Sequence, residues 1–112
     1  REGSSMLALE EEVASPEGAA RARQSPRVVA SVMAAMKMGG DPDEAAAALR
    51  VAPALAVARL GPGDAPALEE IPIALAAAAV QYAREEPPSS TTVSLCAAAG
   101  AALREAEATW AG

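Results

Sequence analysis

The sequence contains no histidine and no phenylalanine, and it has a single residue each of cysteine, tryptophan and tyrosine. Histidine is the commonest general base near neutral pH and the commonest metal ligand, so its absence argues against acid–base catalysis and against a zinc site. The lone thiol, Cys96, has no second cysteine for an internal disulfide. Because it is flanked by Leu95 and the alanines 97–99, we expect an inert small hydrophobe. The sequence therefore predicts no enzyme activity, no cofactor and no metal.

Long hydrophobic runs are also missing. The longest, residues 71–80 (IPIALAAAAV), has half the length of the roughly 20-residue apolar segment that spans a membrane. Residues 1–6 (REGSSM) show none of the apolar stretch that is typical of a signal peptide. We therefore expect a soluble, cytoplasmic protein that does not enter a membrane.

Positive charge is scarce, with 9 basic against 15 acidic residues and a formal net charge of −6. The only concentration of basic residues is one small cluster, formed by Arg21, Arg23 and Arg27. An acidic surface favours solubility and repels the phosphate backbone of nucleic acids. The charge balance therefore disfavours nucleic acid as a partner.

Alanine dominates the apolar content, since it makes up more than half of the 52% hydrophobic residues. Alanine buries little area, but it has the highest helix propensity and lets helix backbones approach closely. Helix starts are marked by the pairs Ser15–Pro16, Ser25–Pro26 and Asp41–Pro42. In each pair the polar side chain caps a free backbone N–H, and the proline occupies the first helical position.

These patterns predict an all-α fold, a small bundle of about five or six short alanine-rich helices, with orthogonal or up-down packing left open. We expect a single domain over residues 6–112, with residues 1–5 as either foreign residues or a disordered tail. The expected helices cover residues 6–14, 16–24, 26–38, 42–51, 53–60, 72–86 and 92–110, with one further turn at 66–70.

Small and apolar side chains repeat every three or four residues along the last expected helix. This seam consists of Val93, Cys96, Gly100, Leu103 and Trp110. The spacing favours packing against the expected helix 72–86, and the alternative is a seam between two copies of the chain.

Residues 41–60 (DPDEAAAALRVAPALAVARL) resemble the helix–turn–helix family. The resemblance consists of an acidic-capped first helix with Ala46, a turn at residues 49–51, and a second helix that begins at Pro53. It implies a DNA-binding transcriptional regulator, which we keep as the alternative function. Base reading uses polar residues at the start of the second helix, whereas Arg59 stands near its end here.

The same region also resembles a ubiquitin-associated domain. The residues that carry this resemblance are Met38–Gly39, Asp41–Pro42, Ala48–Arg50, Ala56–Val57 and Leu60. In that family the Met-Gly loop and the end of the last helix form the ubiquitin-binding surface. The resemblance therefore implies Met38 and Leu60 as candidate partner-binding residues, although Gly40 replaces the aromatic residue that usually follows Met-Gly.

Three of the four methionines, Met33, Met36 and Met38, lie close together in the sequence. Methionine adapts its shape, so such a cluster can line a groove for a partner helix. The alternative is that Met33 and Met36 fill the core, with Met38 the most exposed of the three. We expect a non-catalytic helical interaction module or small subunit that binds a protein partner, or a second copy of itself, through Met33, Met36, Met38 and Leu60.

Overall fold

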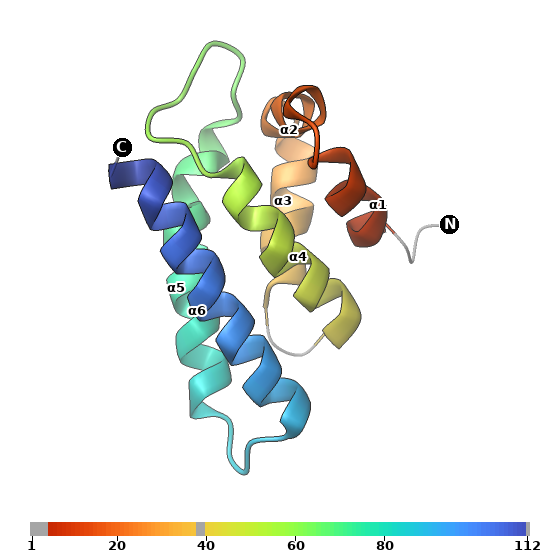
Figure 1. Cartoon of the computed structure of the whole chain (residues 1–112), viewed down its shortest axis with the longest axis vertical. Helices are drawn as coiled ribbons and strands as arrows, with labels where there is room; N and C mark the ends of the chain where they lie inside the picture. Colours follow the sequence, from red (N-terminus) through yellow and green to blue (C-terminus); the bar gives the residue numbers. More distant parts are fainter. Residues whose placement is uncertain (1–4, 38–39, 112) are drawn as a thin grey trace.

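The computed structural model describes residues 5–37 and 40–111 of the chain. Within these residues the all-α prediction is confirmed, because the chain forms six α-helices and one 3-10 helix (Figure 1). They are α1 (Ser5–Glu12), α2 (Pro16–Arg23), α3 (Pro26–Ala35), α4 (Pro42–Leu55), the 3-10 helix η2 (Pro66–Glu70), α5 (Ile71–Arg84) and α6 (Ser90–Ala111).

The expected tail at residues 1–5 lies mostly outside the described residues, and Met38 and Gly39 lie outside them entirely. The proposed domain boundary at residue 6 therefore stays a prediction. In the part of the chain that is described, no helix is both long enough and apolar enough to cross a membrane.

The predicted capping pairs begin helices in the structure. Each polar side chain accepts a hydrogen bond from a backbone N–H in the first turn: Ser15 from Gly18 (3.1 Å), Ser25 from Val28 (3.2 Å) and Asp41 from Asp43 (2.9 Å). These bonds satisfy donors that would otherwise lack a partner at the helix end. The starts of α2, α3 and α4 are thus determined by local sequence.

Helix α4 occupies the centre of the molecule. It packs against α1 and α3 on one side and against α5 and α6 on the other (Figure 1). Its buried residues include four alanines, and the full set is Ala45, Ala47, Ala48, Leu49, Val51, Ala52 and Leu55. Because alanine side chains are short, several helices can approach the α4 backbone at once.

The predicted break before Pro53 is wrong, because α4 continues through Pro53 to Leu55. Pro53 cannot donate a hydrogen bond to the Leu49 carbonyl, which costs the helix stability. Burial of Val51 and Leu55, both completely shielded from solvent, holds the last turn in place. Residues 56–65, all of them described, contain no helix. The second helix of the helix–turn–helix alternative is therefore not formed.

The prediction that the last helix packs against the preceding one is confirmed, since α5 and α6 form an antiparallel hairpin (Figure 1). The predicted seam is displaced around the helix axis, however. Val93 is 56% exposed, and the buried face consists of Thr92, Leu95, Ala99, Ala102 and Ala106. This face is buried because α6 contacts α4 as well as α5, and the predicted seam considered only one neighbour.

An ion pair joins α1 to α4 at the surface. Arg50 donates two hydrogen bonds to Glu10, at 2.6 Å from Nε to Oε2 and 3.1 Å from Nη2 to Oε1. These bonds lower the pKa of the Glu10 carboxyl and raise the pKa of the Arg50 guanidinium. Because both side chains are partly exposed to solvent, the pair stabilises the fold by less than about 1 kcal/mol.

Replacing Gly18 by alanine should destabilise the protein, although alanine is the better helix former. A Cβ atom at Gly18 would overlap the Glu12 carbonyl oxygen, which is backbone and cannot move aside cheaply. We expect Gly18→Ala to lower the free energy of unfolding by about 1–3 kcal/mol. The matched control is Gly100→Ala, whose Cβ would meet only the Arg104 side chain, at 3.8 Å. It should raise stability by about 0.5–1 kcal/mol.

Urea unfolding followed by circular dichroism measures both changes. Equal effects of the two substitutions would contradict the close contact between the end of α1 and the start of α2.

Candidate partner-binding site

The two sides of α5 have opposite roles. Ile71, Leu75, Ala78 and Tyr82 recur every three or four residues and are buried against the rest of the bundle. This spacing places them on one face of the helix, as expected for a core-facing stripe. The inner face of α5 therefore anchors the helix, and its outer face is left to solvent.

The outer face of α5 is also apolar. It carries Ile73, Ala76, Ala77 and Val80, which we call the α5 stripe. Ile73 is 70% exposed and Val80 is 48% exposed. Single exposed apolar residues are common on protein surfaces, but a contiguous stripe beside a groove is typical of an interaction site. The α5 stripe is therefore the strongest candidate for contact with a partner.

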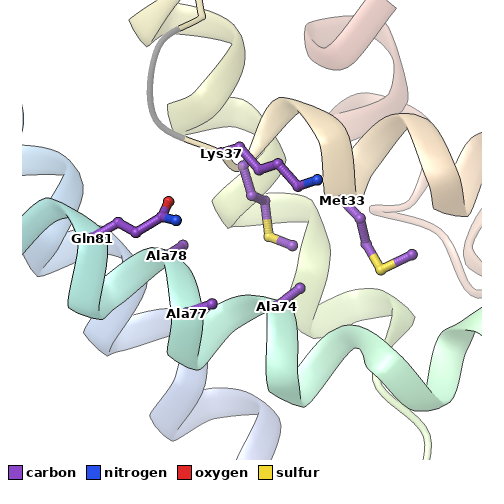
Figure 2. Close-up of a pocket in the computed structure, with 7 residues that line it drawn as sticks. Met33, Lys37, Ala74, Ala77, Ala78 and Gln81 are labelled. Atoms are coloured by element: carbon purple, nitrogen blue, oxygen red, sulfur yellow. The ribbon is translucent and has the colours of Figure 1, made fainter.

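A small groove borders the α5 stripe where the end of α3 and the residues after it approach α5 (Figure 2). Its volume is about 80 Å³, and it is lined by Met33, Met36, Lys37, Ala74, Ala77, Ala78 and Gln81. Figure 2 shows Ala74, Ala77 and Ala78 along the side of α5 that faces α3, with Met33 projecting from α3 and Lys37 from the residues that follow it. Short alanine side chains on one wall leave the space that longer side chains would fill. We call this hollow the α3–α5 groove.

A buried hydrogen bond fixes the position of the groove. The Tyr82 hydroxyl of α5 donates to the backbone carbonyl of Met36, which follows the last residue of α3, at 3.0 Å. Burial of the phenol raises the pKa of Tyr82 above its usual value, which further favours the protonated hydroxyl that donates this bond. This bond ties the end of α3 to α5, and it satisfies a carbonyl that α3 leaves without a helical partner.

Charged side chains lie at the two ends of the α5 stripe. Glu70, the residue that precedes α5, lines a hollow together with Met33, Lys37 and Ile73. Arg84, the last residue of α5, lines the opposite end together with Val80. The apolar stripe is thus bounded by a carboxylate at one end and by a guanidinium at the other.

The structure describes three of the four residues predicted to bind a partner, and it does not bring all three to one site. Met33 is half-buried and lines the groove, and Met36 lines it too but is only 1% exposed. This placement favours the core alternative for Met36. Leu60 lies in the loop between α4 and η2 and packs against the core, and it is not among the residues that line the groove. Met38 lies outside the described residues.

Sequence reasoning missed Ile73 and Val80, the two large exposed residues of the α5 stripe. The apolar run at residues 71–80 indicated a helix with apolar side chains, but its alanines are distributed around the whole helix. A helix that is apolar all round does not reveal which face is buried. Only the packing of α5 against its neighbours distinguishes the two faces.

Comparison with known protein families, curated proteins and solved structures finds no match for this chain. Among the described residues, no group of three or more histidine, cysteine, aspartate or glutamate side chains is placed to hold a metal ion. The Cys96 thiol is partly buried and lies 3.8 Å from the Ala79 carbonyl oxygen in α5.

Substitution of Ile73 should leave the fold intact, because its side chain is mostly in water. We expect Ile73→Asp to change the free energy of unfolding of the monomer by less than about 0.5 kcal/mol. The matched control is Ile71→Ala, which removes a completely buried side chain and should cost about 2–5 kcal/mol. Urea unfolding at low protein concentration compares the two variants. A large loss of stability in Ile73→Asp would contradict the outward orientation of the α5 stripe.

Proposed function

We propose that the chain is a non-catalytic helical interaction module, and that the α5 stripe and the adjoining α3–α5 groove form its contact surface for a protein partner. The observation that carries this proposal is the exposure of Ile73 and Val80 within one apolar stripe. Burying such a stripe against another protein removes apolar area from water, which contributes roughly 25 cal/mol for each Å².

The shape of the surface supports a helical partner. The α3–α5 groove lies beside the α5 stripe and has Met33 on one wall, a side chain that adjusts to the shape of what it contacts. An amphipathic helix commonly binds in such a groove through residues spaced three and four apart. Hydrogen bonding of Tyr82 to Met36 holds the two walls at a fixed separation, so the surface is formed before binding.

The chemistry of the side chains supports a role without catalysis. The sequence has no histidine, and its one thiol is packed between α5 and α6. The residues that line the α3–α5 groove are alanine, methionine, lysine and glutamine, which offer no carboxylate to act as a general base. The groove is suited to apolar contact.

Site-specific crosslinking tests the proposal directly. A photoreactive amino acid replaces Ala77, which is exposed at the centre of the α5 stripe, or Ala101, which is exposed on α6. Illumination in cells that make the protein, followed by mass spectrometry of the adducts, identifies what touches each position. We expect an adduct of defined mass from position 77 and none from position 101.

Comparison with the control at position 101 decides how an adduct at position 77 is interpreted. Adducts of the same kind and amount from both positions would indicate random collision, and no adduct from position 77 would indicate that nothing covers the α5 stripe. Either result would overturn the proposed function.

A further inference from the structure

We infer that the α5 stripe is covered by the α5 stripe of a second copy of this chain, in an antiparallel pair with its two-fold axis near Ala77. This inference rests on the proposed function, and it names the partner. It follows from the order of the residues along the outer face of α5, where the charged side chains are arranged symmetrically about Ala77 and the large apolar side chains nearly so.

The spacing along this face fits the pairing of two helices. Residues at alternating intervals of three and four form the contact line of paired helices. On α5 and the residue before it, this line consists of Glu70, Ile73, Ala77, Val80 and Arg84. Its centre is a small residue, which permits close approach of two helix axes, and its large apolar residues lie on either side.

The charges at the ends of the line are complementary to those of a second copy. Glu70 precedes Ala77 by seven residues and Arg84 follows it by seven, so each lies about 10 Å from the centre along the helix axis. A two-fold axis through the level of Ala77 therefore brings Glu70 of one copy to the level of Arg84 of the other. The same axis creates this pair twice, because a two-fold interface uses one surface on both subunits.

The charges also select the direction of pairing. In a parallel pair, Glu70 would lie beside Glu70 and Arg84 beside Arg84, and both contacts would be repulsive. In the antiparallel pair both contacts become attractive. Charge order thus favours one of the two arrangements that the apolar residues alone would allow.

The antiparallel pair also places side chains of one copy beside the α3–α5 groove of the other. With the axis near Ala77, Ile73 of the second copy reaches the level of Gln81, and Val80 of the second copy reaches the level of Ala74. Gln81 and Ala74 both line the groove. The large apolar side chains of one copy therefore come to rest beside the hollow that the alanines of the other copy leave.

The expected dimer is weak. The 14 residues of α5 extend over about 21 Å. A single pair of helices of this length buries less than the roughly 800 Å² per partner that is usual in stable complexes. We therefore expect a monomer–dimer equilibrium in the micromolar range or above, and measurements must include concentrated protein.

The end charges of α5 also have an explanation within one chain, because an acidic residue at the start of a helix and a basic residue at its end complement the helix dipole. That effect acts on each monomer separately. It predicts that reversing either charge weakens the helix and that reversing both weakens it further. Pairing of two copies predicts the opposite for association, since opposite reversals compensate.

The test combines two charge reversals, Glu70→Arg and Arg84→Glu, and follows dimerisation by sedimentation equilibrium. Each variant alone should dimerise at least about 10-fold more weakly than the unmodified chain, because like charges face each other twice in the dimer. A mixture of the two variants should form a heterodimer, since both of its contacts become attractive. The matched control, Arg104→Glu, reverses an exposed charge on α6 and should leave dimerisation unchanged.

Circular dichroism of each variant checks that it remains folded, and the double variant Glu70→Arg/Arg84→Glu provides a second readout because it should dimerise again on its own. An unmodified chain that stays monomeric at all concentrations would overturn the inference, as would single variants that dimerise normally or a mixture that does not associate. Crosslinking at position 77 to a different protein would also overturn it while leaving the proposed function in place. An adduct of twice the chain mass would support both.

Discussion

Packing around the alanines of α4 is the constraint on which the rest of the structure depends. Ala45, Ala48 and Ala52 are almost completely buried, and helices from both halves of the chain lie against this one segment. Because a methyl group is short, the neighbouring helices are held close to the α4 backbone and leave little room between them. A chain without phenylalanine can form a core in this way, since many small contacts replace a few large ones.

The small volume of the side chains around α4 also explains why an apolar surface remains exposed on α5. Helix α5 is apolar on both sides, and the compact bundle around α4 covers only the face that carries Leu75 and Tyr82. The other face has no helix against it in the described residues, so Ile73 and Val80 stay in water. The position of the α5 stripe is thus a consequence of the fold, and we propose that a second protein surface completes the burial that one chain begins. In the proposed pair, Glu70 and Arg84 favour the antiparallel direction of that contact.

Local signals in the sequence predicted the fold class and most helix starts, because a capping side chain followed by proline acts within one turn. Pro53 shows where such reasoning fails: its local effect is to end a helix, but burial of Leu55 outweighs it. The candidate site was predicted only in part. Met33 lies in the α3–α5 groove, whereas the α5 stripe was not identified, since uniform alanine composition conceals which face of a helix is outside. That information arises only when the helices are packed together.

The most direct test of this account is a dilution series followed by nitrogen–proton NMR spectra of the unmodified chain. The account predicts concentration-dependent shifts of the amide signals along α5 and at Met33 and Lys37, with the signals of α1 and α2 unchanged. Spectra that are identical at every concentration, or shifts that concentrate on α1 and α2, would contradict the claim that the outer face of α5 is a surface built for contact with a second copy.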